Sequence, residues 1–555
     1  MNKAKIASLK VAAVLCGFAW VSTQSIPAQP PAATAATAAT AAGSEEAVIL
    51  TPKPPATPRI NGAQVFGVRP GHPFLFTIPA TGDRPMTFSA KGLPKGLALD
   101  SATGHITGSL AKEGTYNVTL VAKNALGSNN RAFKIVCGPN IGLTPALGWN
   151  SWNCFAGAVT QERVKAAADA MVASGLINHG WTYINIDDYW ERNQRGMRND
   201  PTLGGPGRDE TGKIVPNPRF PDMKGLTDYI HSLGLKAGLY SGPGPTTCGG
   251  CEASWQHEEQ DARSYADWGF DYLKYDWCSY TSVLPSTNSD GTRRTDGTMR
   301  RDIPTLKKPY QVMRAALDKV PRDIMFSLCQ YGWGDVWKWG ADPTIGGNSW
   351  RTTGDITDTW NSLSSIGFSQ FGHEKFAGPG HFNDPDMMIV GKVGWGPRLH
   401  PTRLTPNEQY THVSLWCLLT GPLLIGCDMT AMDDFTVSLL SNDEVLAVSQ
   451  DPLGRQAGRV VKQDSLEIWA KDMSDGSKAV GLFNRNNAET NVVAKWSDLG
   501  ISGSRMVRDL WRQRDIGKFS GRFETAVPRH GVVLVKVEAV APTARQLQSG
   551  WHGGQ

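Results

Sequence analysis

Short apolar runs of strand length alternate with helical stretches through the middle of the chain, from about residue 140 to residue 450. The eight apolar runs are Ala146–Trp149, Tyr183–Asp187, Leu235–Tyr240, Tyr272–Tyr275, Ile324–Leu328, Ser349–Arg351, Phe382–Asp386 and Leu423–Cys427. Helical patches lie between them, for example in residues 163–173, 223–233 and 260–268. Eight strand-then-helix steps over about 300 residues are typical of a (β/α)8 TIM barrel, which we assign to residues 139–450.

The regions on both sides of this barrel are rich in short β-type runs. In residues 58–138, runs such as Phe74–Ile78 and Tyr116–Ala122 are separated by glycine and proline turns, which predicts a small Ig-like β-sandwich. Residues 451–540 contain further short runs, among them Val532–Val537, and predict a C-terminal antiparallel β-sandwich. The predicted fold class is therefore multidomain, with a TIM barrel between two β-sandwiches.

The N-terminal segment has the layout of an export signal. Three lysines precede an apolar run over residues 11–21, and small residues follow it. This order predicts a secretory signal peptide over residues 1–28 and a secreted or periplasmic protein. The alternative is an anchor that is not cleaved, although the run is short for a membrane span. Residues 29–57 are rich in Ala, Thr and Pro and predict a flexible linker.

Net charge carries little information about partners. The 56 Lys and Arg against 51 Asp and Glu give +5, and removal of the three signal lysines leaves 5 − 3 = +2. No basic stripe is present, so we expect no nucleic-acid partner. The 19 tryptophans are more informative, because flat aromatic rings stack against sugars. A large tryptophan-filled core is the alternative, and composition alone does not separate the two.

Eight cysteines remain after the signal. They are Cys137, Cys154, Cys248, Cys251, Cys278, Cys329, Cys417 and Cys427. In an exported protein some of them should pair. The Cys248-Gly-Gly-Cys251 motif has the spacing of half a zinc site or of a redox motif. No second ligand pair at zinc spacing accompanies it, so a structural bridge is favoured, and we expect neither a metal nor a cofactor.

Acidic side chains stand at the carboxyl ends of the predicted barrel strands, where the active site of such a barrel lies. They are Asp187, Asp188, Asp276, Asp355, Asp384 and Asp386. Lys274 and Arg351 stand among them. One aspartate after a strand often caps the next helix, and a lone Lys or Arg often makes a structural ion pair. Convergence from four strand ends is harder to explain in this way, since buried carboxylates are costly unless they bind something.

Two chemistries suit such a cluster. One is glycoside hydrolysis by a pair of carboxylates, and the other is a divalent-metal site with oxygen ligands. Six tryptophans lie at or just after barrel strands and favour a sugar: Trp149, Trp152, Trp190, Trp277, Trp333 and Trp350. The strand ends contribute no histidine cluster, which argues against zinc or iron.

Five motifs in these strand ends resemble the α-galactosidase (melibiase) family, glycoside hydrolase family 27, over about residues 140–540. They are Gly148-Trp149-Asn150-Ser151-Trp152, Asp187-Asp188-Tyr189-Trp190, Lys274-Tyr275-Asp276-Trp277-Cys278, Trp350-Arg351-Thr352-Thr353-Gly354-Asp355-Ile356 and Asn383-Asp384-Pro385-Asp386-Met387. The Ig-like segment is similar to modules on exported bacterial proteins. We expect it to be a spacer or a lid for the barrel, because it lacks an evident aromatic platform.

The resemblance implies a retaining glycosidase. Asp276 would be the nucleophile that forms a glycosyl-enzyme, and Asp355 would be the general acid and then the base. Lys274 lies two residues before Asp276 on the same strand face and should help to keep it ionised. In the family, residues at the positions of Asp187 and Asp188 bind the galactose 4- and 6-hydroxyls. The remaining pocket residues would be Trp152, Tyr240, Lys274, Cys278, Gln330, Arg351 and Asp386.

The resemblance also implies a disulfide between Cys248 and Cys278, which leaves Cys251 without a family partner. One departure concerns Gln330, because many members carry a glutamate there that reads the sugar 2-hydroxyl. A glutamine donates a hydrogen bond but carries no charge. We therefore expect an α-galactosidase, with a β-L-arabinopyranosidase or an α-N-acetylgalactosaminidase as same-fold alternatives. A non-catalytic carbohydrate-binding protein is the alternative of another class.

Overall fold

The computed structural model describes residues 45–193, 200–285, 287, 290–292 and 302–538. The predicted signal peptide and residues 29–44 of the predicted linker lie outside the described residues, as do residues 539–540 of the predicted C-terminal domain. Among the residues that are described, no helix is long and apolar enough to cross a membrane.

Eight parallel strands form the central sheet, and each coincides with one of the eight predicted apolar runs. They are β10 (Leu147–Asn150), β11 (Tyr183–Asn185), β12 (Lys236–Ser241), β13 (Tyr272–Asp276), β14 (Met325–Cys329), β15 (Ser349–Arg351), β16 (Phe382–Asp384) and β19 (Leu423–Ile425). Their spatial order is β16-β15-β14-β13-β12-β11-β10-β19. An isolated parallel bridge joins Met388, four residues after the end of β16, to Ile425 of β19, so the two ends of this order meet as in the predicted barrel. The seventh strand ends at Asp384, so Pro385 stands outside its ladder.

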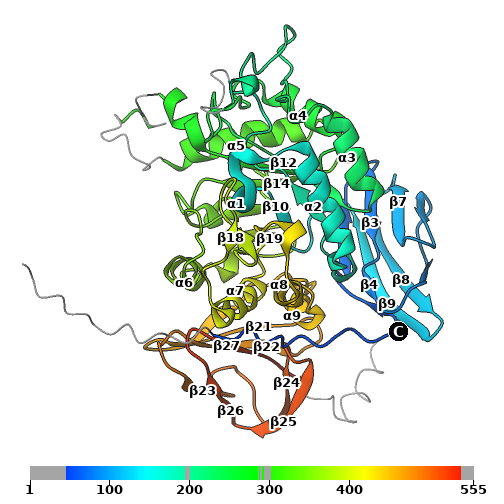
Figure 1. Ribbon diagram of the computed structural model, residues 1–555, viewed down its shortest axis with the longest axis vertical. Coiled ribbons are helices and arrows are strands. Elements are labelled where there is room, and N and C mark those ends of the chain that lie inside the picture. The colour runs from blue at the N-terminus through cyan, green and yellow to red at the C-terminus, as the bar shows by residue number, and fades with distance from the viewer. Residues whose placement is uncertain (1–44, 194–199, 286, 288–289, 293–301, 539–555) are drawn as a thin grey trace, which may run out of the picture. The chain divides into compact units, whose positions relative to one another are not determined.

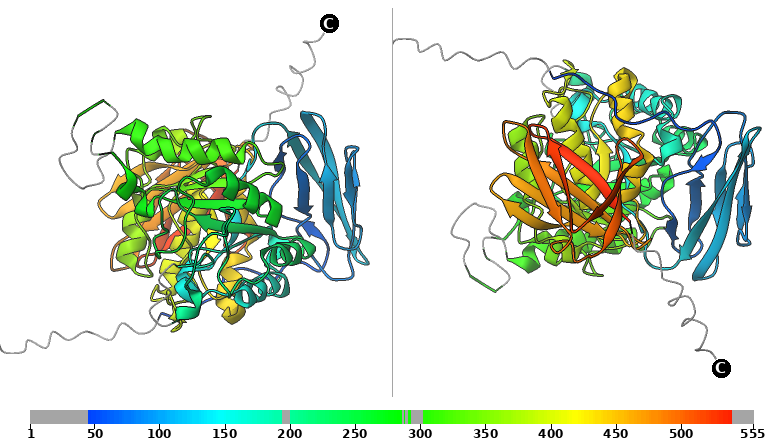
Figure 2. Two further views of the ribbon diagram at one scale, coloured as in Figure 1. Left: turned by 90° about the horizontal axis from the view of Figure 1, so that it is seen from above. Right: turned by 90° about the horizontal axis from the view of Figure 1, so that it is seen from below.

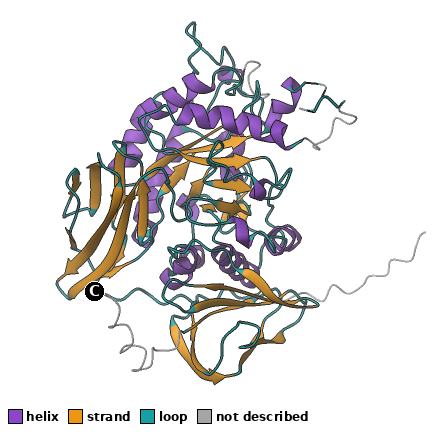
Figure 3. Cartoon of the chain, turned by 180° about the vertical axis from the view of Figure 1, so that it is seen from behind, coloured by secondary structure: helices purple, strands orange, loops and turns teal. Residues whose placement is uncertain are grey.

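Helices surround this sheet on the outside (Figures 1 and 3). They are α1 (Trp152–Phe155), α2 (Gln161–Ala173), α3 (Met223–Ser232), α4 (Glu258–Trp268), α5 (Ile303–Leu317), α6 (Trp360–Phe368), α7 (Pro406–Leu419), α8 (Asp434–Leu440) and α9 (Asp443–Ser449). The predicted helical patches fall within α2, α3 and α4 except for Leu233, the residue after α3. Thr160 caps α2 by accepting a hydrogen bond from the Arg163 amide, and Thr405 with Glu408 forms a capping box on α7.

Two β-modules flank the barrel. The N-terminal one has a sheet of β2 (Val65–Val68), β9 (Gly127–Cys137), β8 (Gly114–Asn124) and β5 (Thr87–Lys91), and a sheet of β3 (Pro73–Thr77), β7 (His105–Ser109) and β6 (Leu97–Leu99). A short pair, β1 (Arg59–Ile60) and β4 (Ala80–Thr81), completes it. The C-terminal one has a sheet of β20 (Gly458–Gln463), β21 (Leu466–Asp472), β22 (Lys478–Asn484), β27 (Val532–Val537), β24 (Ser504–Asp509) and β25 (Arg514–Ser520), and a pair of β23 (Thr490–Lys495) and β26 (Arg522–Val527).

Helix α7 joins the barrel to the C-terminal module. All its residues from Glu408 to Leu419 are buried, because one side faces the barrel and another contacts β21, β22 and β27. A helix that is buried all round lacks the one-sided apolar stripe of a surface helix. Figure 1 shows α7 directly above β21 and β22.

The N-terminal module packs against the end of the barrel where the strands begin. The Thr77 hydroxyl donates to the Gly234 carbonyl at 2.7 Å, just before β12, and Arg69 Nε lies 2.6 Å from Asp323 Oδ1, just before β14. Asn61 donates to the Asn178 carbonyl, which precedes β11. Figure 2 shows this module, in blue, along one side of the barrel. The carboxyl ends of the strands are therefore left to the opposite end.

Candidate active site

A cavity lies at the carboxyl ends of the strands, where the active site of such a barrel is expected. It is lined by Trp152, Asn153, Asp187, Asp188, Tyr240, Cys248, Lys274, Asp276, Tyr331, Arg351, Asp355, Asp386 and Met387. The structure thus brings together both predicted catalytic aspartates and seven of the nine predicted binding residues.

Asp276 is the last residue of β13 and is only 5% exposed. Its Oδ1 accepts a hydrogen bond from the Tyr331 hydroxyl at 2.7 Å, and its Oδ2 accepts a longer one from the Tyr240 hydroxyl at 3.3 Å. Burial raises the pKa of Asp276, although the nearby Lys274 charge and the Tyr331 hydrogen bond oppose that rise. The carboxylate is therefore held in place by two neutral donors rather than by an ion pair.

Lys274 makes its ion pair with another carboxylate. Its Nζ lies 2.8 Å from Asp187 Oδ2 and 5.2 Å from the centre of the Tyr240 ring. Burial disfavours the charge on Lys274, but Asp187 and Asp276 outweigh burial, so the pKa of Lys274 is raised well above its usual value. The lysine lowers the pKa of Asp276 through its field, as predicted, yet this effect does not overcome burial.

Asp355 stands at the mouth of the cavity, with its side chain 64% exposed. Arg351 Nη2 donates to Asp355 Oδ1 at 2.9 Å, and Arg351 Nη1 lies 3.0 Å from Asp386 Oδ1. Partial desolvation at the cavity mouth would raise the pKa of Asp355, but the Arg351 and Lys274 charges outweigh it and lower that pKa. For Asp386, burial outweighs Arg351 and raises the pKa to about 6.

Asp187 and Asp188 form one wall of the cavity. Asn150 and Lys274 both donate to Asp187 Oδ2 at 2.8 Å. The backbone amide of Gly249 donates to Asp188 Oδ2 at 2.7 Å. Asp188 is 1% exposed, and burial raises its pKa to about 7. Side chains from the ends of β10 and β13 thus orient the first aspartate, whereas a loop amide orients the second.

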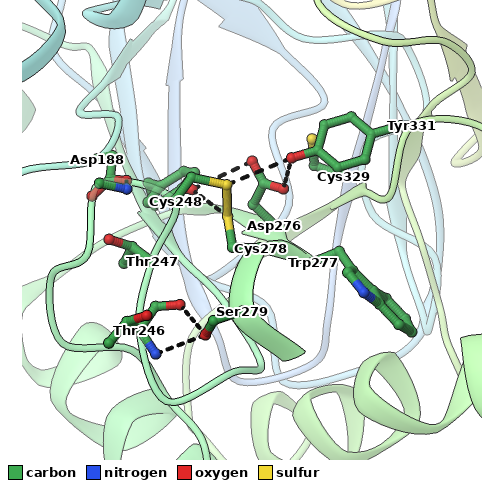
Figure 4. Close-up of a disulfide and its surroundings, with 12 residues drawn as sticks. Asp188, Thr246, Thr247, Cys248, Asp276, Trp277, Cys278, Ser279, Cys329 and Tyr331 are labelled. Atoms are coloured by element: carbon green, nitrogen blue, oxygen red, sulfur yellow. Dashed lines mark hydrogen bonds between the residues drawn. A yellow bond between two sulfur atoms is a disulfide. The ribbon is translucent and has the colours of Figure 1, made fainter. Parts of the chain in front are cut away.

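The predicted disulfide is present between Cys248 and Cys278 and closes a loop with a sequence separation of 30. Cys278 Sγ lies 3.2 Å from the Tyr240 hydroxyl, and Cys248 Sγ lies 3.6 Å from the Tyr331 hydroxyl. Figure 4 shows the bridge beside the Asp276 carboxylate, with Tyr331 on the opposite side. The bridge therefore contacts both of the tyrosines that hydrogen-bond to Asp276.

Two predicted pocket residues do not line the cavity. Cys278 lies behind its disulfide partner, and Gln330 is fully buried, with its Oε1 accepting from the Gly332 amide at 2.9 Å. The next residue, Tyr331, points into the cavity instead. Tyr331, Asn153 and Met387 are lining residues that sequence reasoning missed. Met387 is the last residue of one of the five motifs, and Asn153 and Tyr331 each follow a predicted pocket residue, which was the only available signal.

The prediction that six strand-end tryptophans form a sugar platform is wrong for most of them. Four are almost completely buried, and each donates its indole N–H to a nearby acceptor: Trp149 to the Cys427 carbonyl, Trp190 to the Tyr240 carbonyl, Trp277 to the Thr281 hydroxyl and Trp350 to the Asn383 side chain. Of the six, only Trp152 lines the cavity, where it stacks on Tyr189 with a centroid distance of 6.3 Å. Four of these six tryptophans therefore belong to the barrel core.

Backbone strain is concentrated around the cavity. Tyr189, Cys278, Tyr331 and Asp386 have φ values of 79°, 35°, 62° and 84°, in the left-handed region that residues other than glycine seldom adopt. The Asp386 amide donates to Asp384 Oδ1 at 2.8 Å, which supports the strained turn. Residues in such conformations cluster at functional sites because the surrounding fold must over-determine them.

Two groups of acid and sulfur ligands lie close enough for a metal ion among the described residues. One contains Asp276 with Cys248 and Cys278, whose sulfurs are both in the disulfide and are not thiolate ligands. The other contains Asp188, Glu191 and Cys251 and lies behind the cavity wall.

Comparison with known proteins gives three family matches along the chain. The model described as "Alpha galactosidase A" matches residues 144–451, and the one described as "Alpha galactosidase C-terminal beta sandwich domain" matches residues 463–537. An Ig domain model matches residues 56–138.

Individual relatives agree with these matches. An alpha-galactosidase from Cyamopsis tetragonoloba is 41% identical over 70% of this chain and 85% of its own. A crystal structure from Bacteroides fragilis is 34% identical, with a TM-score of 0.77, over 89% of this chain and 99% of that chain. A β-L-arabinopyranosidase from Geobacillus stearothermophilus is 27% identical, with a TM-score of 0.61, over 72% of this chain and 98% of that chain.

Proposed function

Since the chain belongs to the alpha-galactosidase A family, we propose that it is a retaining α-galactosidase that removes terminal α-linked galactose from oligo- or polysaccharides. The observation that carries this proposal is the pair of carboxylates with different surroundings. Asp276 is buried at the end of β13 and held by two tyrosine hydroxyls, whereas Asp355 is exposed at the mouth beside Arg351.

The proposed reaction is a double displacement. Asp276 attacks the anomeric carbon while Asp355 gives its proton to the leaving glycosidic oxygen. Asp355 then takes a proton from water, which attacks the glycosyl-Asp276 ester and releases galactose. Two inversions restore the α-configuration.

Asp355 has to be protonated before the first step, yet Arg351 lowers its pKa in the free protein. We propose that sugar hydroxyls occupy the Arg351 N–H groups on binding, which weakens the pair and raises the pKa of Asp355. The pH profile of kcat/KM reports the free protein and that of kcat reports the complex. We expect the basic limb of kcat to lie at higher pH than that of kcat/KM, and coincident limbs would contradict this step.

The cavity wall supports galactose over L-arabinopyranose. Asp187 and Asp188 both line the cavity, and arabinopyranose lacks the 6-carbon and therefore the hydroxyl that one of them would bind. A site with buried polar groups rejects an analogue that leaves one unpaired. β-L-Arabinopyranosidase activity remains the second candidate because of the similarity to the Geobacillus stearothermophilus protein. An α-N-acetylgalactosaminidase would need room beside the 2-position of the sugar, and we propose that Tyr331, which lies against Asp276, fills that space.

A panel of p-nitrophenyl glycosides tests the proposal. We expect hydrolysis of the α-D-galactopyranoside to exceed that of the β-L-arabinopyranoside and the α-N-acetylgalactosaminide, and NMR to detect α-galactose first. The matched variants are Asp276→Asn and Asp355→Asn, with Asp318→Asn, on an exposed helix end, as the control. Full activity in Asp276→Asn would refute the mechanism. Sugar binding by the intact protein without turnover would favour the non-catalytic alternative.

We also propose export to the periplasm or the medium. The motivation is the N-terminal order of lysines and apolar residues, together with a disulfide, a bond that persists in oxidising compartments. N-terminal sequencing of the protein from fractionated cells tests it. We expect a mature chain that begins near residue 29, and an uncleaved cytoplasmic chain would contradict export.

A further inference from the structure

Glu191 is the least satisfied buried acid behind the cavity. Its side chain is 1% exposed, and neither carboxylate oxygen has a hydrogen-bond partner. No Lys, Arg or His among the described residues forms an ion pair with it. An ionised carboxylate in such a place is very costly, and a protonated one would need an acceptor for its own hydrogen bond. Neither protonation state of Glu191 is therefore satisfied by the described residues.

Two other potential ligands point at the same place. One oxygen of Asp188, one of Glu191 and the sulfur of Cys251 all lie within 4.8 Å of one another. Cys251 is 1% exposed and is a free thiol, because Cys248 of the same motif is bonded to Cys278. No hydrogen bond joins Glu191 to either of the other two. Two ligands that share a cation with bonds of about 2.0–2.3 Å lie at most about 4.6 Å apart, so a modest closing of the group would let all three bind one ion.

The loops that carry these ligands are already fixed next to each other. Asp188 and Glu191 follow β11, and Cys251 follows β12. The Glu252 amide donates to the Arg192 carbonyl at 2.8 Å, which joins the two loops directly. Within the second loop, the Cys251 amide donates to the Thr247 hydroxyl at 2.9 Å. The three ligands are therefore held by backbone contacts and need little rearrangement to bind an ion.

We propose that Asp188, Glu191 and Cys251 bind a structural zinc ion that links the loops after β11 and β12. One thiolate and two carboxylates are ligands that zinc accepts, and a water completes four-coordination. The thiolate favours zinc over magnesium or calcium, which prefer oxygen ligands. This site differs from the sequence expectation of no metal, because that expectation searched for a second Cys or His pair and not for buried carboxylates on a neighbouring loop.

Zinc at this position would hold Asp188 from behind the cavity. Asp188 lines the cavity and accepts from the Gly249 amide, so a bound ion fixes both the side chain and the loop that contacts it. A ligated carboxylate keeps further lone pairs for a second partner. The site is thus a second crosslink near the disulfide, and its existence does not depend on the reaction catalysed.

The test is metal analysis of the tag-free, disulfide-intact protein. After chelation and titration with zinc chloride, we expect about one zinc ion per chain and a higher midpoint of thermal unfolding. With cobalt(II) in place of zinc, we expect a thiolate-to-cobalt charge-transfer band. Cys251→Ser should abolish the band, and Glu191→Gln should weaken zinc binding about tenfold or more. The control Cys137→Ser changes another buried thiol, in β9, and should keep both signals.

Several outcomes would overturn the proposal. They are less than about 0.1 zinc per chain after titration of the wild type, a cobalt band that survives in Cys251→Ser, and equal zinc affinity in Glu191→Gln and wild type. If Cys251→Ser does not fold, the wild-type stoichiometry and Glu191→Gln decide the matter. None of these measurements uses activity, so their failure would refute the zinc site and leave the proposed hydrolase function untouched.

Discussion

At the N-terminal end of the barrel strands, buried acids are matched by cations. Asp271 Oδ2 lies 2.8 Å from His231 Nε2, and its Oδ1 lies 3.2 Å from Arg322. Burial alone would raise the pKa of Asp271, but His231 and Arg322 outweigh burial and lower it. Asp323 is bonded in the same way to Arg69 of the N-terminal module. This end of the barrel is built from paired charges that favour folding.

At the carboxyl end, the balance is reversed. Burial raises the pKa of Asp276, Asp384 and Asp386 even though Lys274 and Arg351 lie among them. Both ends bury aspartates at strand termini of one sheet, so burial itself does not distinguish them. The difference lies in how many cations serve the acids at each end. At the carboxyl end Asp355 and Asp386 share Arg351, and Asp276 and Asp384 form no ion pair among the described residues. Acids with perturbed pKa values of this kind are typical of sites that bind or react.

The largest expected effect comes from neutralising the acid at the end of β13. Asp276→Asn should lower kcat/KM on an α-galactoside by about 10⁴-fold or more, because the proposed nucleophile is lost. Its thermal midpoint should stay the same or rise, since a costly buried charge is removed. Kinetics and calorimetry on the same preparation measure both. A large loss of stability in Asp276→Asn would instead mean that Asp276 stabilises the fold, as we propose for Asp271.

The matched change at the other end of the same strand should act in the opposite way. Asp271→Asn leaves His231 and Arg322 without their partner and should destabilise the fold by about 3 kcal/mol. The kcat/KM of the remaining folded protein should change less than about twofold, because Asp271 lies away from the cavity. Urea unfolding and active-site titration check this. A loss of activity as large as that of Asp276→Asn would contradict the proposed difference between the two ends of the barrel strands.

The two ends should also respond to pH with opposite signs. Asp271 has a lowered folded pKa, so its stabilisation is present above its unfolded pKa and is lost as pH falls through the folded value. Asp386 has a folded pKa raised to about 6, so its contribution is complete below its unfolded pKa and is lost as pH rises through about 6.

Stability measured against pH for two variants tests these signs. The stability of wild type relative to Asp386→Asn should fall by about 2–3 kcal/mol between pH 4 and pH 7. The stability of wild type relative to Asp271→Asn should instead fall as the medium becomes more acidic. Parallel curves for both variants would show that the two carboxylates are in equivalent environments.

The sequence was sufficient to predict the barrel strands and the end of the barrel at which the cavity lies. All eight predicted runs fall on barrel strands, and those of β14 and β19 are nearly continuously apolar, because a parallel strand is buried on both faces. Aspartates at the carboxyl ends of those strands marked the cavity, since the fold brings these ends together. The Cys248–Cys278 bridge followed from the family resemblance and not from residue spacing.

Side-chain direction could not be predicted in the same way. Gln330 and Tyr331 are neighbours, and the backbone φ of 62° at Tyr331 decides which of them reaches the cavity. Trp149 and Trp190 stand at strand ends but turn their indole N–H groups toward neighbouring strand ends inside the barrel. The position of a residue in the sequence predicts that it lies near the site. The packing of its side chain decides whether it faces the ligand or the core.

The smallest effect concerns how Asp276 is kept ionised without a cation of its own. Tyr331→Phe removes the 2.7 Å hydrogen bond that lowers the pKa of Asp276, so this pKa should rise. The nucleophile must be ionised, and the acid limb of kcat/KM should therefore move to higher pH by about one unit, with about tenfold lower activity below it. Tyr240→Phe removes the longer 3.3 Å bond and should shift the limb less. A larger shift in Tyr240→Phe than in Tyr331→Phe would mean that the length of the hydrogen bond does not determine how strongly each tyrosine lowers the pKa of Asp276. If the acid limb is unshifted in both variants, Asp276 is not the group that titrates.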